Sequence, residues 1–326
     1  MRKGTTGTGV KRIFIAIALV GVVAGIAGYP AAADALSLKW LDARDGLPQA
    51  RITSLLAAGG RLIAGFEGRG IAVLGPGDAR FRFVTRADGL PSDDVKSLVL
   101  YKGQVHAGTA EGIAVEEGKR WTVLREAAGI PLRNVVLAAS PDGKELWACS
   151  LFLAGGTVVF DGKGWTFIGG EGKGLFNSIS SFGFSPGAVL LGSGMGMVYE
   201  RKGKEIEPLR ERFPEANVTS VAERGGVVYT GTNRGLYLWR GKEWQPASVP
   251  AGFAGEAVFA ILKSEIDLIV AGIRGVFLLD RAGEMRVLTG SEQFLGGPVY
   301  ALAEDGGTLY AATERGVAVM KDWRER

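Results

Sequence analysis

Apolar and polar positions follow one another in the same order in seven successive segments of this chain. Each segment has an apolar strand, a second strand that ends in a Gly-Thr-like pair, a turn closed by glycine, and a third apolar strand. The pairs that end the second strands are Gly65-Phe66, Gly108-Thr109, Cys149-Ser150, Gly192-Ser193, Gly231-Thr232, Ala271-Gly272 and Ala312-Thr313. Their first members are 43, 41, 43, 39, 40 and 41 residues apart, so the chain is built from repeats of nearly constant length.

A period of about 40 residues made of strands is typical of a β-propeller, in which each repeat forms one four-stranded blade. Second strands such as Leu62-Ile63-Ala64 are apolar on both faces, as expected for a sheet that is covered on both sides. We therefore predict an all-β fold, a seven-bladed β-propeller, over residues 34–326.

The innermost strand of most repeats has a small residue at its third position. These residues are Ser54, Ser97, Ser181, Ser220, Ala260 and Ala301. Innermost strands crowd around the axis of a propeller, so we expect these positions to lie where space is smallest. The third repeat has Leu137 instead, which the pattern does not explain.

The two ends of the chain are expected to share the last blade. Only six residues follow Met320, too few for an outer strand, whereas the segment 36–41 before the first repeat is an apolar strand without a repeat of its own. Pairing of these N- and C-terminal segments would close the ring.

The first 33 residues have the pattern of a secretory signal peptide. Lys and Arg at positions 2, 3, 11 and 12 precede an apolar run from Ile13 to Gly28, and Ala31-Ala32-Ala33 offers a cleavage site. The run is shorter than the roughly 20 residues that span a bilayer, although an uncleaved anchor reaching Ala33 is an alternative. We expect a periplasmic or secreted protein that contacts a membrane only if this segment is retained.

Charge and composition then narrow the function. The chain has 38 basic and 34 acidic residues, and removal of residues 1–33 takes away four basic residues and leaves 34 of each. A formally neutral domain gives no reason to expect a nucleic-acid partner. Cys149 is the only cysteine, and we expect it to be a small buried hydrophobe.

Catalytic chemistry is not expected from this composition. The only histidine, His106, lies on an apolar second strand, which favours a packed core residue. One His and one Cys cannot form a zinc or copper site of the usual kind, so no metal and no cofactor are predicted. The acidic pair Asp93-Asp94 lies on a junction between repeats, where turn chemistry is the usual role.

The blade junctions resemble a known repeat. Asp45-Gly46-Leu47-Pro48 and Asp88-Gly89-Leu90-Pro91 each lead into an innermost strand, and Gly231-Thr232-Asn233-Arg234-Gly235-Leu236 spans a later turn. Together these residues resemble the two-component regulator propeller repeat, and the resemblance extends from Leu36 to Met320. It implies a ligand-binding, periplasmic sensor-type propeller of the kind found in membrane kinases, here without the kinase part. His106 takes the place of that repeat's tryptophan.

The most distinctive candidate site lies at the turns between second and third strands. The residues before the closing glycines are Arg69, Glu111, Met195, Arg234, Arg274 and Arg315. The four arginines belong to blades one, five, six and seven, which are neighbours in a closed ring, so they predict one basic crescent for an anionic ligand or a protein partner. The turn of blade three contains Leu151-Phe152-Leu153, which is either a continued buried strand, the alternative we favour, or an exposed anchor in which Phe152 would contact the partner.

We therefore expect a non-enzymatic extracytoplasmic binding module. One alternative is a periplasmic sensor component that works with a separate membrane histidine kinase. The other is a propeller hydrolase or lyase, which would need a cluster of carboxylates in the channel mouth.

Overall fold

The computed structural model describes residues 38–151, 156–169, 178–209, 213, 216–250, 253–264, 267–280, 284–290 and 297–325. Leu36–Arg326 forms one compact unit that is distinct from Met1–Ala35. The signal peptide predicted for residues 1–33 therefore lies outside the described residues, as does Phe152.

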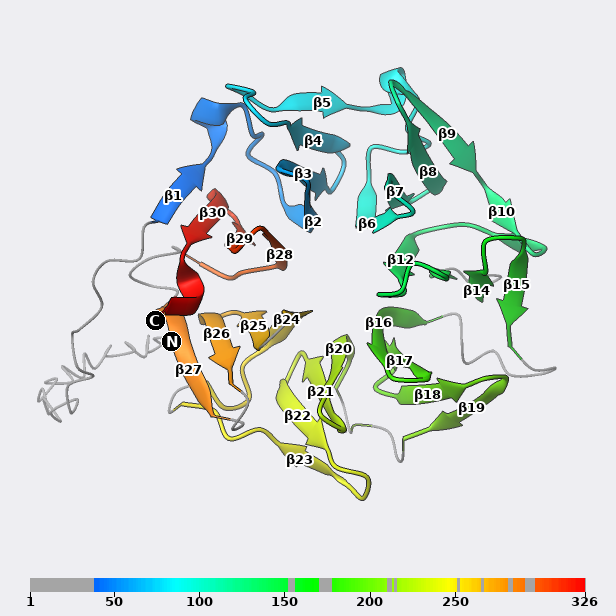
Figure 1. Ribbon diagram of the computed structural model, residues 1–326, viewed down its shortest axis with the longest axis vertical. Helices are drawn as coiled ribbons and strands as arrows, with labels where there is room; N and C mark the ends of the chain where they lie inside the picture. Colours follow the sequence, from blue (N-terminus) through cyan, green and yellow to red (C-terminus); the bar gives the residue numbers. More distant parts are fainter. Residues whose placement is uncertain are drawn as a thin grey trace, which may run out of the picture. The chain divides into compact units, whose positions relative to one another are not determined.

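Seven four-stranded antiparallel sheets surround a common axis (Figure 1). From the inside outward, blade one consists of β2 (Ile52–Ala58), β3 (Arg61–Phe66), β4 (Ile71–Leu74) and β5 (Arg82–Val84), and blade two consists of β6 (Val95–Tyr101), β7 (Gln104–Thr109), β8 (Gly112–Glu117) and β9 (Arg120–Leu124). Blade three consists of β12 (Val135–Ala139), β13 (Leu146–Ser150), β14 (Thr157–Phe160) and β15 (Trp165–Ile168), and blade four consists of β16 (Ile179–Ser185), β17 (Ala188–Ser193), β18 (Val198–Lys202) and β19 (Glu205–Pro208).

Blade five consists of β20 (Val218–Arg224), β21 (Val227–Thr232), β22 (Gly235–Trp239) and β23 (Trp244–Pro246), and blade six consists of β24 (Val258–Lys263), β25 (Leu268–Gly272), β26 (Gly275–Leu279) and β27 (Met285–Gly290). Blade seven consists of β28 (Ala301–Asp305), β29 (Thr308–Thr313), β30 (Gly316–Lys321) and β1 (Leu38–Leu41). A hairpin of β10 (Glu126–Ala127) and β11 (Ile130–Pro131) and the 3₁₀ turns η1 (Ala43–Asp45), η2 (Arg86–Asp88) and η5 (Trp323–Glu325) complete the described elements, which include no α-helix. The predicted all-β, seven-bladed propeller is confirmed.

The first and last strands of the described residues meet in blade seven. Strand β1 pairs antiparallel with β30, with Leu38 opposite Met320 and Leu41 opposite Val317. In Figure 1 the blue β1 lies outside the red β30. The predicted closure of the ring is therefore confirmed, and no outer strand of blade seven comes from the residues after Met320.

Neighbouring blades bury each other's faces. The innermost strands contact one another in order around the ring, from β2 through β6, β12, β16, β20, β24 and β28 back to β2. Each apolar cluster draws on more than one blade; one of them, for example, joins Leu41, Leu55 and Val319 of blades seven and one. This packing on both sides explains why the second strands are apolar on both faces.

A β-bulge explains the small residues of the innermost strands. In blade one, Ile52 pairs with Phe66 and Ser54 pairs with Gly65, so the intervening Thr53 is an extra residue. The same shift occurs in blades two, four, five and six. A Cβ atom on Gly65 would lie 2.6 Å from Val95 Cγ1 of the next blade, which shows how closely the blades approach here.

Blade three lacks this bulge, and its absence corrects the alignment of Leu137. Leu137 pairs with Ala148, as Leu55 pairs with Ala64 in blade one. The N–H of Leu137 also donates to Ser97 Oγ at 2.9 Å, as the N–H of Leu98 donates to Ser54 Oγ. Leu137 therefore occupies the fourth position of its strand, where an apolar residue is normal, and not the small third position.

Candidate functional site

Turns and junctions divide the propeller into two faces. In an antiparallel blade, the turn between the second and third strands lies at the same end as the connection to the next blade. Hydrogen bonds join the two kinds of segment directly: Gly70 N donates to Asp93 O at 2.7 Å, and Ala110 N donates to Asp94 O at 2.9 Å. We call this end the junction face and the other end the opposite face.

In blades two, five and seven, the threonine that ends the second strand positions the residue before the closing glycine. In blade five, Thr232 Oγ1 donates to Gly235 O at 2.9 Å and accepts from Arg234 N at 3.0 Å. Thr313 makes the same two bonds around Arg315 in blade seven. Because the hydroxyl fixes both sides of the turn, the backbone of the intervening residue is held in place while its side chain stays outside the blade.

All four predicted arginines lie in these turns on the junction face, on four consecutive blades. Arg69, Arg234 and Arg315 are exposed, and Arg274 is half-buried. The structure therefore puts them in equivalent places around the ring, in the order that the repeats predict.

Arg274 and Arg315 contact groups of the chain itself. Arg274 Nη2 lies 3.1 Å from Glu256 Oε1, in the junction that leads into blade six. The guanidinium of Arg315 lies 4.6 Å above the ring of Trp40 on β1. Asp42 is also close by: hydrogen bonds from Arg44 lower the pKa of its carboxyl, and the charge of Arg315 adds to that effect. The crescent is thus partly balanced by acidic and aromatic neighbours.

Sequence reasoning missed an aromatic pair at the inner edge of this face. The rings of Phe259 and Tyr300, from blades six and seven, lie 5.3 Å apart, and the guanidinium of Arg51 lies 5.1 Å from the centre of the Tyr300 ring. Tyr300 Oη donates to Glu314 Oε1 at 2.9 Å. Burial, followed by this hydrogen bond, raises the pKa of Tyr300, which keeps the phenol protonated.

The residue at the second position of the innermost strand could have revealed this aromatic pair from the sequence. In blades one, four and five this position holds Thr53, Ser180 and Thr219, whose hydroxyls donate to the carbonyls of Val95, Val218 and Val258 in the next blade at 2.7, 2.7 and 2.6 Å. Phe259 and Tyr300 occupy this position in blades six and seven and make no such bond. A comparison of the repeats at this one position would have singled them out.

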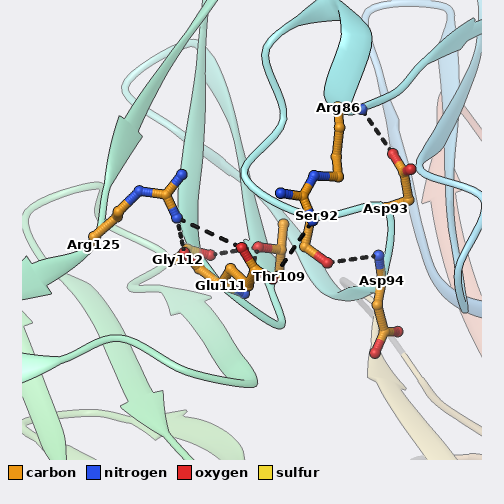
Figure 2. Close-up of polar contacts among 8 residues, drawn as sticks. All are labelled: Arg86, Ser92, Asp93, Asp94, Thr109, Glu111, Gly112 and Arg125. Atoms are coloured by element: carbon orange, nitrogen blue, oxygen red, sulfur yellow. Dashed lines mark hydrogen bonds and ion pairs between the residues drawn. The ribbon is translucent and has the colours of Figure 1, made fainter.

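Blade two carries Glu111 in its turn, at the place where blade one carries Arg69. Glu111 Oε1 lies 3.5 Å from Arg86 Nη1, and Glu111 Oε2 lies 3.8 Å from Arg125 Nη1, which also donates to the Glu111 carbonyl at 3.0 Å (Figure 2). The negative charge that ends the crescent is thus held between two arginines from the junctions on either side of blade two.

The acidic pair Asp93-Asp94, in the junction between blades one and two, contacts neighbouring groups of the chain. Asp93 Oδ1 accepts from Arg86 N at 2.7 Å, and Asp94 Oδ2 lies 2.6 Å from Lys96 Nζ (Figure 2 draws the first contact). Asp94 N also donates to Ser92 Oγ at 3.1 Å. These contacts agree with the predicted turn role.

His106 and Cys149 are buried as predicted. His106 is 7% exposed and packs edge-on against Tyr101, and burial lowers the pKa of its ring. Cys149 is fully buried on β13, and burial raises the pKa of its thiol to about 11. Within the described ranges, no three His, Cys, Asp or Glu side chains come together as a metal site would require. The described residues also include no helix with the length and apolar character needed to cross a membrane.

The expectation for blade three is partly wrong. Strand β13 ends at Ser150, so the favoured continuation through Leu151 does not occur. Leu151 is half-buried and packs at the edge of the cluster that contains Trp147. Whether Phe152 contacts a partner remains a prediction, because Phe152 lies outside the described residues.

Solved structures share this fold. The extracellular domain of BT3049, described as a hybrid two-component system of B. thetaiotaomicron, matches with a TM-score of 0.69 and 17% identity over 88% of this chain and 41% of that one. The extracellular domain of BT4673, described as a one-component system of the same organism, matches with a TM-score of 0.69 and 14% identity over 87% of this chain and 40% of that one. A catalytically inactive virginiamycin B lyase from Staphylococcus aureus, solved with quinupristin, matches with a TM-score of 0.66 and 14% identity over 87% of this chain and 98% of that one.

No protein-family model matches the chain, and no curated protein matches it. The chain spans about two fifths of the length of the two extracellular domains. At these identities the likeness establishes the shared fold. The chain is a seven-bladed β-propeller, and its structural likeness to extracellular domains of two-component and one-component systems agrees with the resemblance of its sequence to the two-component regulator propeller repeat.

Proposed function

We propose that this propeller is a non-enzymatic binding module that works outside the cytoplasm and binds an anionic ligand or an acidic protein segment on its junction face. The observation that carries the proposal is the set of arginines at equivalent turns of four consecutive blades, Arg69, Arg234, Arg274 and Arg315. Guanidinium groups form paired hydrogen bonds with carboxylates and phosphates. The basic groups gather on one arc although the chain after residue 33 is formally neutral.

The channel mouth adds a second kind of contact to this face. Phe259 and Tyr300 are half-buried rings, and Arg51 is exposed beside them. Aromatic rings next to a cation suit a ligand that has both an apolar or ring-shaped part and a negative charge. Together these groups support recognition at the inner edge of the crescent.

A defined acidic probe tests the proposal. We expect a fluorescent peptide of alternating Asp and Glu to bind the wild-type domain, and the affinity to fall as salt is raised because the contacts are screened over about 8 Å at physiological ionic strength. Replacement of Arg69, Arg234, Arg274 and Arg315 by Ser should weaken binding at least tenfold. Fluorescence anisotropy measures both effects.

The opposite face offers a matched control with the same loss of charge. Lys119, Lys163, Lys204 and Lys242 are exposed in turns of that face, and their replacement by Ser also removes four positive charges. An equal loss of affinity in both quadruple variants would mean that binding depends on net charge alone and would contradict a site on the junction face.

A sensor component that acts with a separate membrane histidine kinase is a second candidate. The likeness to extracellular domains of two-component systems favours it. Under this alternative, deletion of the gene should abolish ligand-dependent phosphorylation of a response regulator in the cell.

The predicted signal peptide supports a location outside the cytoplasm. We expect the intact mass of the native protein to correspond to a start near Asp34; a mass that includes residues 1–33 would indicate an anchored protein.

The hydrolase or lyase alternative has less support. It needs a cluster of carboxylates in the channel mouth, but Asp94 of blade two and Glu314 of blade seven, two carboxylates of the junction face, contact neighbouring side chains instead. Asp94 pairs with Lys96, and Glu314 accepts from Tyr300. Two separate carboxylates that already have partners favour binding over acid–base catalysis.

A further inference from the structure

A hollow on the opposite face is lined mainly by blades three and four, with Lys263 of blade six also in its wall. It is a cavity of about 640 Å³, within the range of about 300–1,000 Å³ that small-molecule sites occupy. Its walls include the turn at residues 140–145, Phe184 near the end of β16, and Arg201 on β18. None of these residues belongs to the junction face.

The wall from blade three is formed by an unusually long turn. Residues 140–145 connect β12 to β13, whereas two glycines suffice in blades one, five and seven. The turn is fixed internally: Glu145 N donates to Ser140 Oγ at 2.8 Å, and Ser140 Oγ donates to Asp142 Oδ1 at 2.7 Å. The hydrogen bond from Ser140, followed by those from Lys144, lowers the pKa of Asp142 to about 2. The cavity is therefore bounded by a preformed wall.

One buried tryptophan holds two opposite charges in this cavity. Trp147 is fully buried, and its Nε1 donates to Glu145 Oε2 at 2.9 Å. The guanidinium of Arg201 lies 4.9 Å from the centre of the same indole ring. Glu145 and Arg201 are both lining residues, so an anion and a cation that contact the same indole ring both face the cavity.

These two charges are the ones that remain for an occupant. Among the described residues, no ion pair within 4.0 Å involves Glu145 or Arg201, although both line the same cavity. The two lysines of the lining form ion pairs. Lys144 Nζ lies 3.0 Å from Asp142 Oδ2, and Lys263 Nζ lies 3.5 Å from Glu223 Oε2. The complement of one fixed anion and one fixed cation is a molecule that carries both charges.

We propose that this cavity binds a free α-amino acid with an aromatic or aliphatic side chain. Its ammonium group would face Glu145, its carboxylate would face Arg201, and its side chain would lie toward the half-buried Phe184. Both charges of an α-amino acid stand on one carbon, which suits groups that flank a single indole. Arg binds carboxylate with paired hydrogen bonds, and Phe184 supplies apolar area. The site is separate from the proposed junction-face site and does not depend on it.

Three related probes test this assignment by calorimetry. L-phenylalanine has both charges, 3-phenylpropionate lacks the ammonium group, and phenethylamine lacks the carboxylate. We expect phenylalanine to bind at least tenfold more tightly than either analogue, because each analogue leaves one fixed charge of the cavity without a partner. Equal affinity of phenylalanine and one analogue, or no measurable binding of phenylalanine, would overturn the proposal. Tighter binding of the dipeptide Phe-Ala would overturn the assignment to a free amino acid.

Variants of the two charges should have opposite selectivity. Arg201→Gln should weaken phenylalanine and phenylpropionate and leave phenethylamine unchanged, whereas Glu145→Gln should weaken phenylalanine and phenethylamine and leave phenylpropionate unchanged. Arg201→Lys keeps the charge above Trp147 and should restore part of the affinity. Arg240→Gln and Glu205→Gln, exposed on the same face outside the lining, are the matched controls. Equal effects of the cavity variants and these controls would contradict the site, and the melting temperature of each variant verifies its folding.

Discussion

Thr232 shows how one residue prepares a binding surface without touching a ligand. Its hydroxyl closes the turn at Gly235 and holds the N–H of Arg234, so the sequence Gly-Thr-x-Arg-Gly encodes a turn that exposes an arginine. Thr109 makes the same two bonds around Glu111 in blade two. At this scale a short motif is sufficient, because donor and acceptor are separated by only two or three residues.

Cys149 provides a first test at the residue scale. Its thiol is fully buried and has a pKa raised to about 11. Because the thiolate is the reactive form, we expect Ellman's reagent at mildly alkaline pH to label the native protein roughly 100-fold more slowly than the unfolded protein. Absorbance of the released thiolate measures both rates. Equal rates would show that β13 opens readily in the native state.

Glu111 provides a second test. Glu111→Gln removes the charge that Arg86 and Arg125 approach at 3.5 and 3.8 Å. Both arginine side chains are more than half exposed, so we expect the free energy of unfolding to fall by only about 0.5 kcal/mol in low salt and by less in high salt. Urea unfolding at two salt concentrations measures the change. Glu205→Gln, on an exposed strand end, is the control; an effect of Glu111→Gln that does not depend on salt would contradict an ionic origin.

At the scale of strands and blades, the packing of neighbouring blades depends on how closely their innermost strands approach each other. A bulge inserts the second position in five blades, and the serines that follow it at the third position in blades one and two receive an N–H from the next blade. Blade three lacks the bulge, which moves Leu137 by one position relative to the repeat. Whether an innermost strand holds this extra residue is decided by its pairing with the second strand, so the sequence alone did not reveal it.

Gly108 tests this close approach. A Cβ atom there would lie 2.2 Å from the Val135 carbonyl oxygen of blade three and 2.5 Å from Ser97 Oγ. The first neighbour is backbone and cannot move aside, so we expect Gly108→Ala to lower the free energy of unfolding by about 2–3 kcal/mol. Urea unfolding measures it. Gly164→Ala, where no atom lies within 4 Å of the added group, is the control and should change little; equal midpoints for the two variants would contradict tight packing between blades two and three.

The whole molecule is held together by the pairing of β1 with β30. Leu41 is buried in the cluster between blades seven and one, and Trp40 supports Arg315 of the crescent. Closure thus links the stability of the ring to the proposed binding face. A propeller without it would expose the edge of β30, and exposed edges invite pairing between molecules.

Deletion of the chain through Arg44 tests closure. We expect a lower melting temperature and aggregation, because β30 would lose its partner and Leu41 its place in the cluster. Calorimetry and light scattering measure the two effects. A chain that begins at Leu38 keeps all of β1 and should behave like the longer protein. If the two shortened chains melt alike and stay monomeric, the closure does not stabilise the ring.

The sequence by itself determined the propeller, the number of its blades, the shared last blade and the turns that carry the arginines. It did so because the pattern is local and is repeated seven times, so errors at one repeat are corrected by the others. The buried roles of His106 and Cys149 also followed from strand positions within the repeat. These properties depend on which residues are neighbours along a strand or a turn.

Only the tertiary structure decided what faces those residues. Trp40 reaches Arg315, Phe259 meets Tyr300, and Trp147 gathers Glu145 and Arg201 into one cavity. Two of these contacts, Phe259 with Tyr300 and Trp147 with Arg201, join neighbouring blades, and Trp40 lies hundreds of positions from Arg315 in the chain. They depend on side-chain length, rotamer and the angle between neighbouring blades, which no local pattern of apolar and polar residues encodes. The repeat therefore specifies the scaffold, and the differences between its copies, once placed around the ring, specify the sites.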